Sequence, residues 1–293
     1  MEDRIIAYGG QAVIEGVLMR GQSAMAIAMR APEGLIVTHV EPIASIYRSR
    51  ITKIPFLRGM VMLWDALGLG MRALTISANA QTGENEKVEG PPLYIALTIS
   101  VLIAIGLFFG LPAVVGWFFE QTLGWGVYAG AFMEGILRLG LLVGYIWLIG
   151  FLPDIRRLFG YHGAEHKTIN AYEAGEELTP EKVAKYSIEH PRCGTAFLLM
   201  LVVFSIIFFS LLGPLPIGLR LLSRVLFIPI LAGVAVEYIR WTANHLNSPI
   251  VRLLIKPSLA LQHLTTREPD SAMLEVAIKS FQTMRMAEQE VVL

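Results

Sequence analysis

The chain has 293 residues, of which 54% are hydrophobic and only 16% are charged, and this composition excludes an ordinary soluble enzyme. Basic and acidic residues balance at 24 each, so no overall positive field favours nucleic acid as a partner. Cys193 is the only cysteine, which excludes an intrachain disulfide and a disulfide-stabilised secreted fold.

The first 90 residues are expected to form a β-rich cytoplasmic region followed by an amphipathic helix. β-favouring residues dominate the runs at 12–20 and 35–40, and a turn signal at 32–34 precedes the second run. After Pro55 the apolar residues recur every three or four positions, which predicts an amphipathic helix before a polar linker.

Four apolar stretches follow, and each is close to the roughly 20 residues that cross a bilayer as a helix. They cover residues 93–119, 127–152, 195–212 and 221–241. Glu134 and Arg138 are the charged residues of the second stretch, and their four-residue spacing allows them to pair with each other. The predicted fold is a mainly α-helical integral membrane protein with about four transmembrane helices and a small N-terminal β-rich region.

The orientation follows from the distribution of basic residues. No Lys or Arg occurs between Lys87 and Arg138, so the positive-inside rule places the turn at 120–125 outside the cell. Both termini and the loop between the second and third helices then face the cytoplasm, as parts of a multi-pass protein of the cell membrane. Arg220 and Arg224 would fall on the outer side and count against this orientation.

The predicted parts of the chain alternate between membrane and cytoplasm. The first two transmembrane helices occupy 91–152, a His-rich loop or helix occupies 153–194, and the third and fourth helices occupy 195–241. A cytoplasmic tail at 242–293 ends in a second amphipathic helix, which we expect to pack on the cytoplasmic part or to lie at the membrane interface. Its apolar stripe consists of Leu274, Ile278, Phe281 and Met284.

The segment at residues 161–167 reads Tyr-His-Gly-Ala-Glu-His-Lys, in a pattern typical of a helix that ends at Gly175. On such a helix, His162 and His166 lie one turn apart on one face, where two imidazoles can bind the same metal ion. The order His-x-x-Glu-His is also that of inverzincin proteases, a similarity confined to five residues. We therefore predict zinc or another divalent metal at the two histidines, with Glu165 as the catalytic base.

Three side chains compete for the place of third ligand. Glu237 is the first choice, because an acidic residue near the end of a membrane helix is costly unless it is paired or bound to a metal. His190 and Cys193 are the alternatives, because both lie just before the third apolar stretch. A closed site of His162, His166, His190 and Cys193 would be structural. In a further alternative no metal binds and the histidines form hydrogen bonds at an interface.

Other polar residues are candidates for orienting the ligands or binding a substrate. Glu15 and Arg20 lie in a glycine-rich segment at 9–21, which is more typical of turns and close backbone approach than of a binding loop. That segment lacks a Walker lysine and a dinucleotide fingerprint, so phosphate binding is not predicted. The remaining candidates lie in polar segments next to the apolar stretches: Arg192, His245, His263 and Arg267.

Four segments together resemble the YqhQ-like family of bacterial membrane proteins. They lie at residues 9–21, 161–167, 190–195 and 264–269. They occur in the family's order, and the resemblance covers almost the whole chain. It implies a protein of a group described as predicted metal-dependent enzymes, with no assigned reaction or substrate.

The leading interpretation is a membrane-embedded, metal-dependent hydrolase with its site at the cytoplasmic face, acting on a membrane-associated substrate. The alternative is a non-catalytic adaptor that docks another membrane protein and holds a structural metal or none. A transporter ranks below both, because the chain shows no interrupted, inverted repeat of apolar segments. The predicted partner is the lipid bilayer, and a homo-oligomer is compatible with the pattern.

Overall fold

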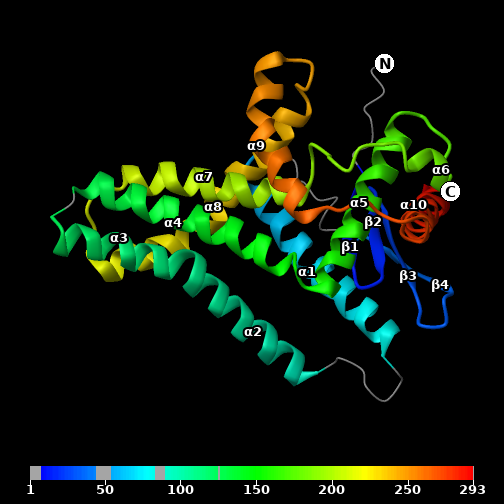
Figure 1. The fold of residues 1–293 in the computed structure, drawn as a ribbon, viewed down its shortest axis with the longest axis horizontal. Helices are drawn as coiled ribbons and strands as arrows, with labels where there is room; N and C mark the ends of the chain where they lie inside the picture. Colours follow the sequence, from blue (N-terminus) through cyan, green and yellow to red (C-terminus); the bar gives the residue numbers. More distant parts are fainter. Residues whose placement is uncertain (1–7, 44–53, 83–89, 125, 293) are drawn as a thin grey trace.

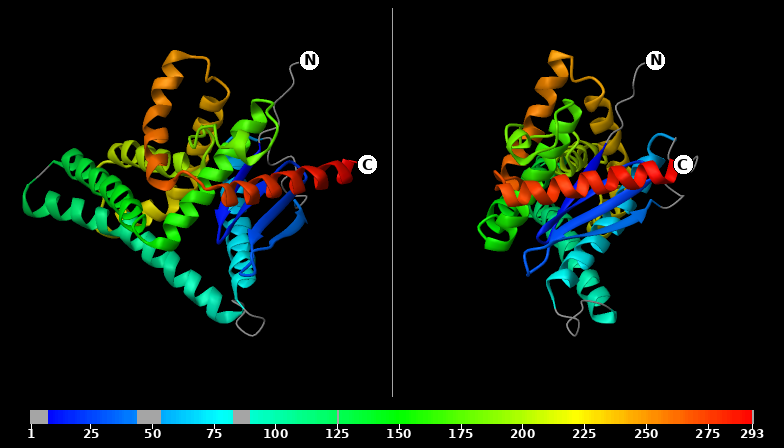
Figure 2. Two further views of the ribbon diagram at one scale, coloured as in Figure 1. Left: turned by 45° about the vertical axis from the view of Figure 1, so that its right-hand side comes forward. Right: turned by 90° about the vertical axis from the view of Figure 1, so that its right-hand side faces the viewer.

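The structure of the chain is a computed structural model that describes residues 8–43, 54–82, 90–124 and 126–292. Figures 1 and 2 show two parts, a bundle of long helices and a smaller part built on a β-sheet. Helix α1 (Leu57–Gln81) contacts both parts. The predicted amphipathic helix after Pro55 is therefore confirmed and joins the sheet to the bundle.

The sheet has four antiparallel strands in the order of the sequence, which confirms the predicted β-rich region. The strands are β1 (Gly9–Val13), β2 (Gly16–Arg20), β3 (Ala24–Arg30) and β4 (Ile36–Pro42). The run at 12–20 is not one strand, because a turn at Ile14 and Glu15 divides it. Tight hairpin turns require a positive φ, and here Glu15 supplies it with φ of 51°, without the Gly or Asn that usually marks such a turn.

Helices cover both faces of the sheet. On one face Val13, Leu18 and Ile27 pack against α1 through Ala73. On the other face Val17 and Ala28 pack against α5 (Pro153–Glu173) and α10 (Ser271–Val292). The apolar stripe predicted for the tail is buried in this second layer, so α10 packs on the sheet. The N-terminal strands and the C-terminal helix thus form one three-layered part.

Four helical segments are long and apolar enough to cross a membrane, which confirms the predicted spans. They are α2 to α3 (Pro91–Thr122), α4 (Val127–Ile149), α7 (Gly194–Leu211) and α8 (Ile217–Ala243). A π-helical turn at Gly106–Gly110 separates α2 (Pro91–Ile105) from α3 (Leu111–Thr122) within the first span. These helices support a location in a membrane, and the cytoplasmic position of the termini stays a prediction.

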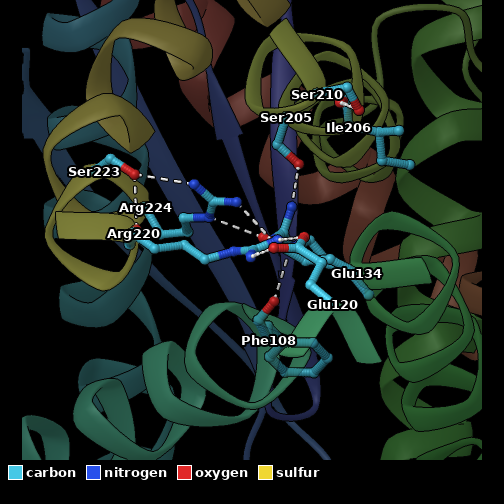
Figure 3. Close-up of polar contacts among 10 residues, drawn as sticks. Phe108, Glu120, Glu134, Ser205, Ile206, Ser210, Arg220, Ser223 and Arg224 are labelled. Carbon is cyan, nitrogen blue, oxygen red and sulfur yellow. Dashed lines mark hydrogen bonds and ion pairs between the residues drawn. The ribbon is translucent and has the colours of Figure 1, made fainter. Parts of the chain in front are cut away.

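A buried ionic cluster joins four of the bundle's helices (Figure 3). Glu134 on α4 accepts hydrogen bonds from Arg138 at 2.7 Å and from Arg224 on α8 at 2.6 and 2.8 Å. Arg220 lies between Glu134 and Glu120 of α3, with 2.8 Å to the nearer carboxylate oxygen. All five side chains are at least nine-tenths buried.

Two further groups complete the cluster. Arg138 donates to the hydroxyl of Ser205 on α7 at 2.7 Å and to the carbonyl of Phe108 at 2.9 Å. Phe108 lies in the π-helical turn, where the regular hydrogen-bond pattern is interrupted and a carbonyl becomes accessible to a side chain. Arg220 and Arg224 therefore point into the bundle and are not free cations of an outer loop. The predicted pair of Glu134 and Arg138 is present as part of this larger cluster.

Helix α9 (Pro249–Thr265) is an element that the sequence analysis did not predict. It follows α8 after a short turn and runs across the direction of α4 and α7 at the end of the bundle nearest the sheet (Figure 1). It packs against α7 and α4, and its Leu261 belongs to the same apolar core as Leu142 and Leu199. The segment between α9 and α10 contacts α5, where the backbone N–H of Arg267 donates to the carbonyl of Phe159.

Candidate metal centre

Helix α5 carries the two histidines as the sequence spacing predicted. Its buried face lies against the sheet and α10, and only three residues separate it from the end of α4. The His162 and His166 rings lie with centroids 4.4 Å apart. His166 is almost fully buried, and His162 is partly exposed. The helix therefore presents two imidazoles side by side next to the spanning bundle.

Both histidines are oriented by backbone carbonyl groups. The Nδ1 atom of His162 lies 2.9 Å from the carbonyl oxygen of Thr265, and Nδ1 of His166 lies 2.5 Å from that of Ile188. A carbonyl oxygen can only accept a hydrogen bond, so we assign the ring proton of each neutral imidazole to Nδ1. Each Nε2 atom then keeps its lone pair. Histidines that bind a metal through one ring nitrogen usually donate a hydrogen bond from the other nitrogen in this way.

Cys193 brings a third donor atom to the histidines. It caps the N-terminus of α7, where its Sγ atom accepts a hydrogen bond from the backbone N–H of Thr195. The same Sγ atom lies 3.2 Å from Nε2 of His162. Ligand atoms of His162, His166 and Cys193 all lie within 4.8 Å of one another. The thiolate is the form of a cysteine that binds metals, and here the sulfur atom faces the imidazole of His162.

Glu237, the first choice for third ligand, does not lie in this group. Its carboxylate forms an ion pair with Arg58 of α1, with 2.6 Å between Nε and Oε1, and also accepts from the backbone N–H of Phe56. Glu237 thus has the partner that an acidic residue near a spanning helix requires, but this partner is an arginine and not a metal ion. Among the described residues, Cys193 and not Glu237 lies in one group with the two histidines.

His190 lies nearby but outside the group of three. Its ring centroid is 5.6 Å from that of His166, and its Nε2 atom is buried and has no hydrogen-bond partner in the described structure. Burial lowers the pKa of His190, so the ring is neutral. The carboxylate of Glu173 lies 3.9 Å from this Nε2 atom and is itself bound by Arg192. Gln262 holds the backbone N–H and carbonyl of His190 at 2.9 and 2.8 Å.

Glu165 is fully enclosed between α5 and strand β1. Its carboxylate accepts a hydrogen bond from the backbone N–H of Gly10, and its Oε2 atom has no hydrogen-bond partner among the described residues. Burial raises the pKa of this carboxyl group to about 7, and the nearby His162 opposes that rise. A carboxyl group that titrates near neutral pH is suited to exchange protons. A Cβ atom at position 10 would lie 2.9 Å from the Glu165 side chain, which explains a glycine there.

Two of the other predicted residues, Glu15 and Arg267, hold neighbouring segments against α5. Glu15 binds Arg157 and the hydroxyl of Tyr161, and so fixes the β1 to β2 turn on α5. Arg267 donates to the carbonyls of His263 and Thr266, and its backbone N–H donates to the carbonyl of Phe159. These contacts join the segment after α9 to α5.

Three more predicted residues make contacts away from the donor atoms. His263 lies 2.7 Å from the carboxylate of Glu189, and the exposed His245 lies 2.7 Å from the carbonyl of Trp241. Arg20 is the last residue of β2. The sequence analysis did not predict roles for Glu173 and Gln262. It could not predict the contacts of Thr265 and Ile188 either, because both residues act through backbone carbonyls, which every residue has.

Comparison with known proteins identifies the family of the chain. A family described as "Protein of unknown function (DUF1385)" matches residues 54–287. The chain is also 34% identical over 290 residues to "Uncharacterized protein YqhQ" of Bacillus subtilis (strain 168), covering 94% of this chain and 91% of that protein. No solved structure matches. The chain therefore belongs to the DUF1385 family of YqhQ-like membrane proteins.

Proposed function

We propose that the protein is a metal-dependent hydrolase that acts on a membrane-associated substrate. The observation that carries this proposal is the convergence of His162, His166 and Cys193, with both Nδ1 atoms held by backbone carbonyls. Two imidazoles and one thiolate suit zinc, which binds nitrogen and sulfur ligands in a tetrahedral arrangement. Three protein ligands leave one of four positions open, as in catalytic zinc sites.

The residues around the donors have separate tasks in this proposal. A bound zinc ion would supply Lewis acidity, which polarises a carbonyl group and makes a water molecule more acidic. Glu165 takes up a proton at its Oε2 atom, which has no competing partner among the described residues. The backbone N–H of Gly10 holds the carboxylate in place during this transfer. Thr265 and Ile188 fix the two imidazole rings through their carbonyls.

The substrate class follows from the position of the site. Only three residues separate α5 from the end of α4, and Cys193 directly precedes α7. The donor atoms therefore adjoin two spanning helices and lie close to the membrane boundary. This position favours an amide or ester carried by a peptide or lipid that is itself held in the membrane.

A structural metal in a non-catalytic adaptor is the second candidate, and His190 favours it. Its buried Nε2 atom has no hydrogen-bond partner among the described residues and lies on the His166 side of the group. A small shift of the loop before α7 would add a fourth ligand and close the site. The two candidates differ in whether His190 binds the ion.

Metal content tests the site itself. Detergent-purified protein is expected to hold about one zinc equivalent by mass spectrometry, and His162→Ala, His166→Ala and Cys193→Ser are expected to lose it. Glu237→Gln is the matched control, because its carboxylate is bound to Arg58, and it should retain the metal. A wild-type protein without metal after loading with zinc would refute the proposal, and so would equal content in all variants.

Two further measurements separate the hydrolase from the adaptor. In cobalt-substituted protein, His190→Gln should leave the absorption of the thiolate complex unchanged if the fourth position is open, and should alter it if His190 is a ligand. In vesicles, wild-type protein should cleave fluorogenic acyl amides or esters of membrane amphiphiles. Glu165→Gln should keep the metal and lose about 100-fold in rate. Absence of cleavage with a closed site would establish the adaptor.

A further inference from the structure

Helix α9 exposes two different stripes side by side. Its buried side, which includes Val251, Leu261 and Gln262, packs on the bundle and on the loop before α7. Ile250 and Leu253 on another side are 68% and 64% exposed. A third side is basic, and the helix contains no Asp or Glu. The exposed residues of that basic stripe are Arg252, Lys256 and His263.

The position of α9 indicates what covers the apolar stripe. The helix runs across the direction of the spanning helices α4 and α7 and lies at the end of the bundle (Figures 1 and 2). Beside it, at the end of α8, Trp241 is 46% exposed, and the hydroxyl of Tyr238 donates to the carbonyl of Leu254 at 3.3 Å. Tryptophan and tyrosine are enriched where membrane meets water. We therefore place α9 in the plane of the bilayer surface, with the apolar stripe in lipid.

A hollow of about 470 Å³ lies between α9 and the loop before α7, next to the basic stripe. Leu246, Ile255 and Leu259 give it apolar walls, and Asn247 and Arg252 give it polar ones. The Nε atom of Arg252 donates to the carbonyl of Leu246 at 2.8 Å, which fixes the side chain at the hollow. Its remaining guanidinium N–H groups have no partner among the described residues.

One basic residue, Arg252, and one acidic residue line the hollow, and a second basic residue, Lys256, lies beside it on α9. Glu189 is an acidic residue of its lining, and its carboxylate lies 2.7 Å from Nε2 of His263. Arg252 and Lys256 are one turn apart on α9, so both can reach the same phosphate group. The apolar stripe beside them would hold the acyl chains of the same molecule.

We propose that α9 and the hollow beside it form a binding site for an anionic phospholipid. The phosphate lies between Arg252 and Lys256, the polar headgroup occupies the hollow, and the acyl chains pack along Ile250 and Leu253. This assignment does not depend on any metal at the histidines.

Native mass spectrometry of the full chain in detergent tests the site, with phosphatidylglycerol and phosphatidylcholine as paired probes. The wild-type protein should retain phosphatidylglycerol preferentially. Because each basic residue near an anionic surface contributes about fivefold in affinity, Arg252→Gln/Lys256→Gln should lose roughly 30-fold of that preference. Arg252→Lys/Lys256→Arg should keep most of it.

A matched control removes two exposed lysines outside the bundle and α9, in Lys185→Gln/Lys279→Gln, and should keep the full preference. Equal retention of both lipids by the wild-type protein would overturn the proposal. An unchanged preference in the Arg252→Gln/Lys256→Gln variant would also overturn it. The same holds if the Lys185→Gln/Lys279→Gln control loses as much of the preference as the Arg252→Gln/Lys256→Gln variant. Displacement of the lipid by millimolar inorganic phosphate would instead assign the site to a free anion. Melting temperatures of all variants verify that they are folded.

Discussion

A Glu134→Gln variant is expected to be recovered in low yield and to melt well below the wild-type protein. The substitution keeps the size of the side chain but removes the carboxylate that three buried guanidinium groups share. Removing one partner of a buried ion pair costs about 3 to 5 kcal/mol, because a charge is left without compensation in a medium of low polarity. Thermal unfolding of the detergent-solubilised protein measures the loss.

The same change at Glu237 provides the control for that experiment. Glu237 and Arg58 are about one-fifth exposed, so their pair is partly screened by solvent and should contribute about 1 kcal/mol or less. Removing one guanidinium as well, in Glu134→Gln/Arg224→Gln, should restore part of the lost stability. If the Glu134→Gln and Glu237→Gln variants have the same melting temperature, the cluster does not stabilise the bundle.

Replacing Gly163 with alanine should damage both stability and metal binding. A Cβ atom at this position would overlap the backbone carbonyl oxygen of Arg267, which cannot move aside like a side chain. The approach is held by a hydrogen bond from the backbone N–H of Arg267 to the carbonyl of Phe159. Overpacking of this kind costs about 1 to 3 kcal/mol. Because Thr265 orients His162, separating the two segments should also reduce zinc content.

Two other glycines serve as graded controls for this substitution. Gly160→Ala meets the flexible side chain of Met273 at 2.7 Å and should cost less, since that side chain can change its rotamer. Gly144→Ala in α4 meets no atom within 4 Å and should leave melting unchanged or slightly higher. Equal melting temperatures for the Gly163 and Gly144 variants would contradict the close approach of α5 and Arg267.

Length and periodicity of apolar residues explain which elements could be predicted. Each of the four spans has enough apolar residues, with few charges among them, to be recognised singly, and α10 has a regular stripe at Leu274, Ile278 and Phe281. Helix α9 escaped prediction because Pro257 interrupts its interior and its exposed side mixes apolar with basic residues. A helix at a lipid surface can expose both apolar and basic residues, whereas helices of soluble proteins are recognised by a single apolar face.

The candidate metal site shows a second limit of prediction from the sequence. The spacing of His162 and His166 is local, so a helix determines their relation, and that part was predictable. The choice between Glu237 and Cys193 depended on Arg58, which is 179 positions from Glu237. The extension of the Glu134 and Arg138 pair depended likewise on Arg220 and Arg224, about 90 positions downstream. Contacts over such separations leave no periodic signal in one sequence.

The contact between His162 and Thr265 also orders the assembly of the protein in time. Ribosomes deliver the chain from the N-terminus, so the histidines emerge about 100 positions before the carbonyl that orients one of them. The sheet is completed later still, because it is covered by α10, whose Ser280 donates to the carbonyl of Ala26 across a separation of 254 positions. A nascent chain that stops after its last span therefore carries the histidines without their orientation and the strands without their cover. Synthesis must therefore reach Thr265 before His162 can be oriented, and α10 before the sheet can be covered.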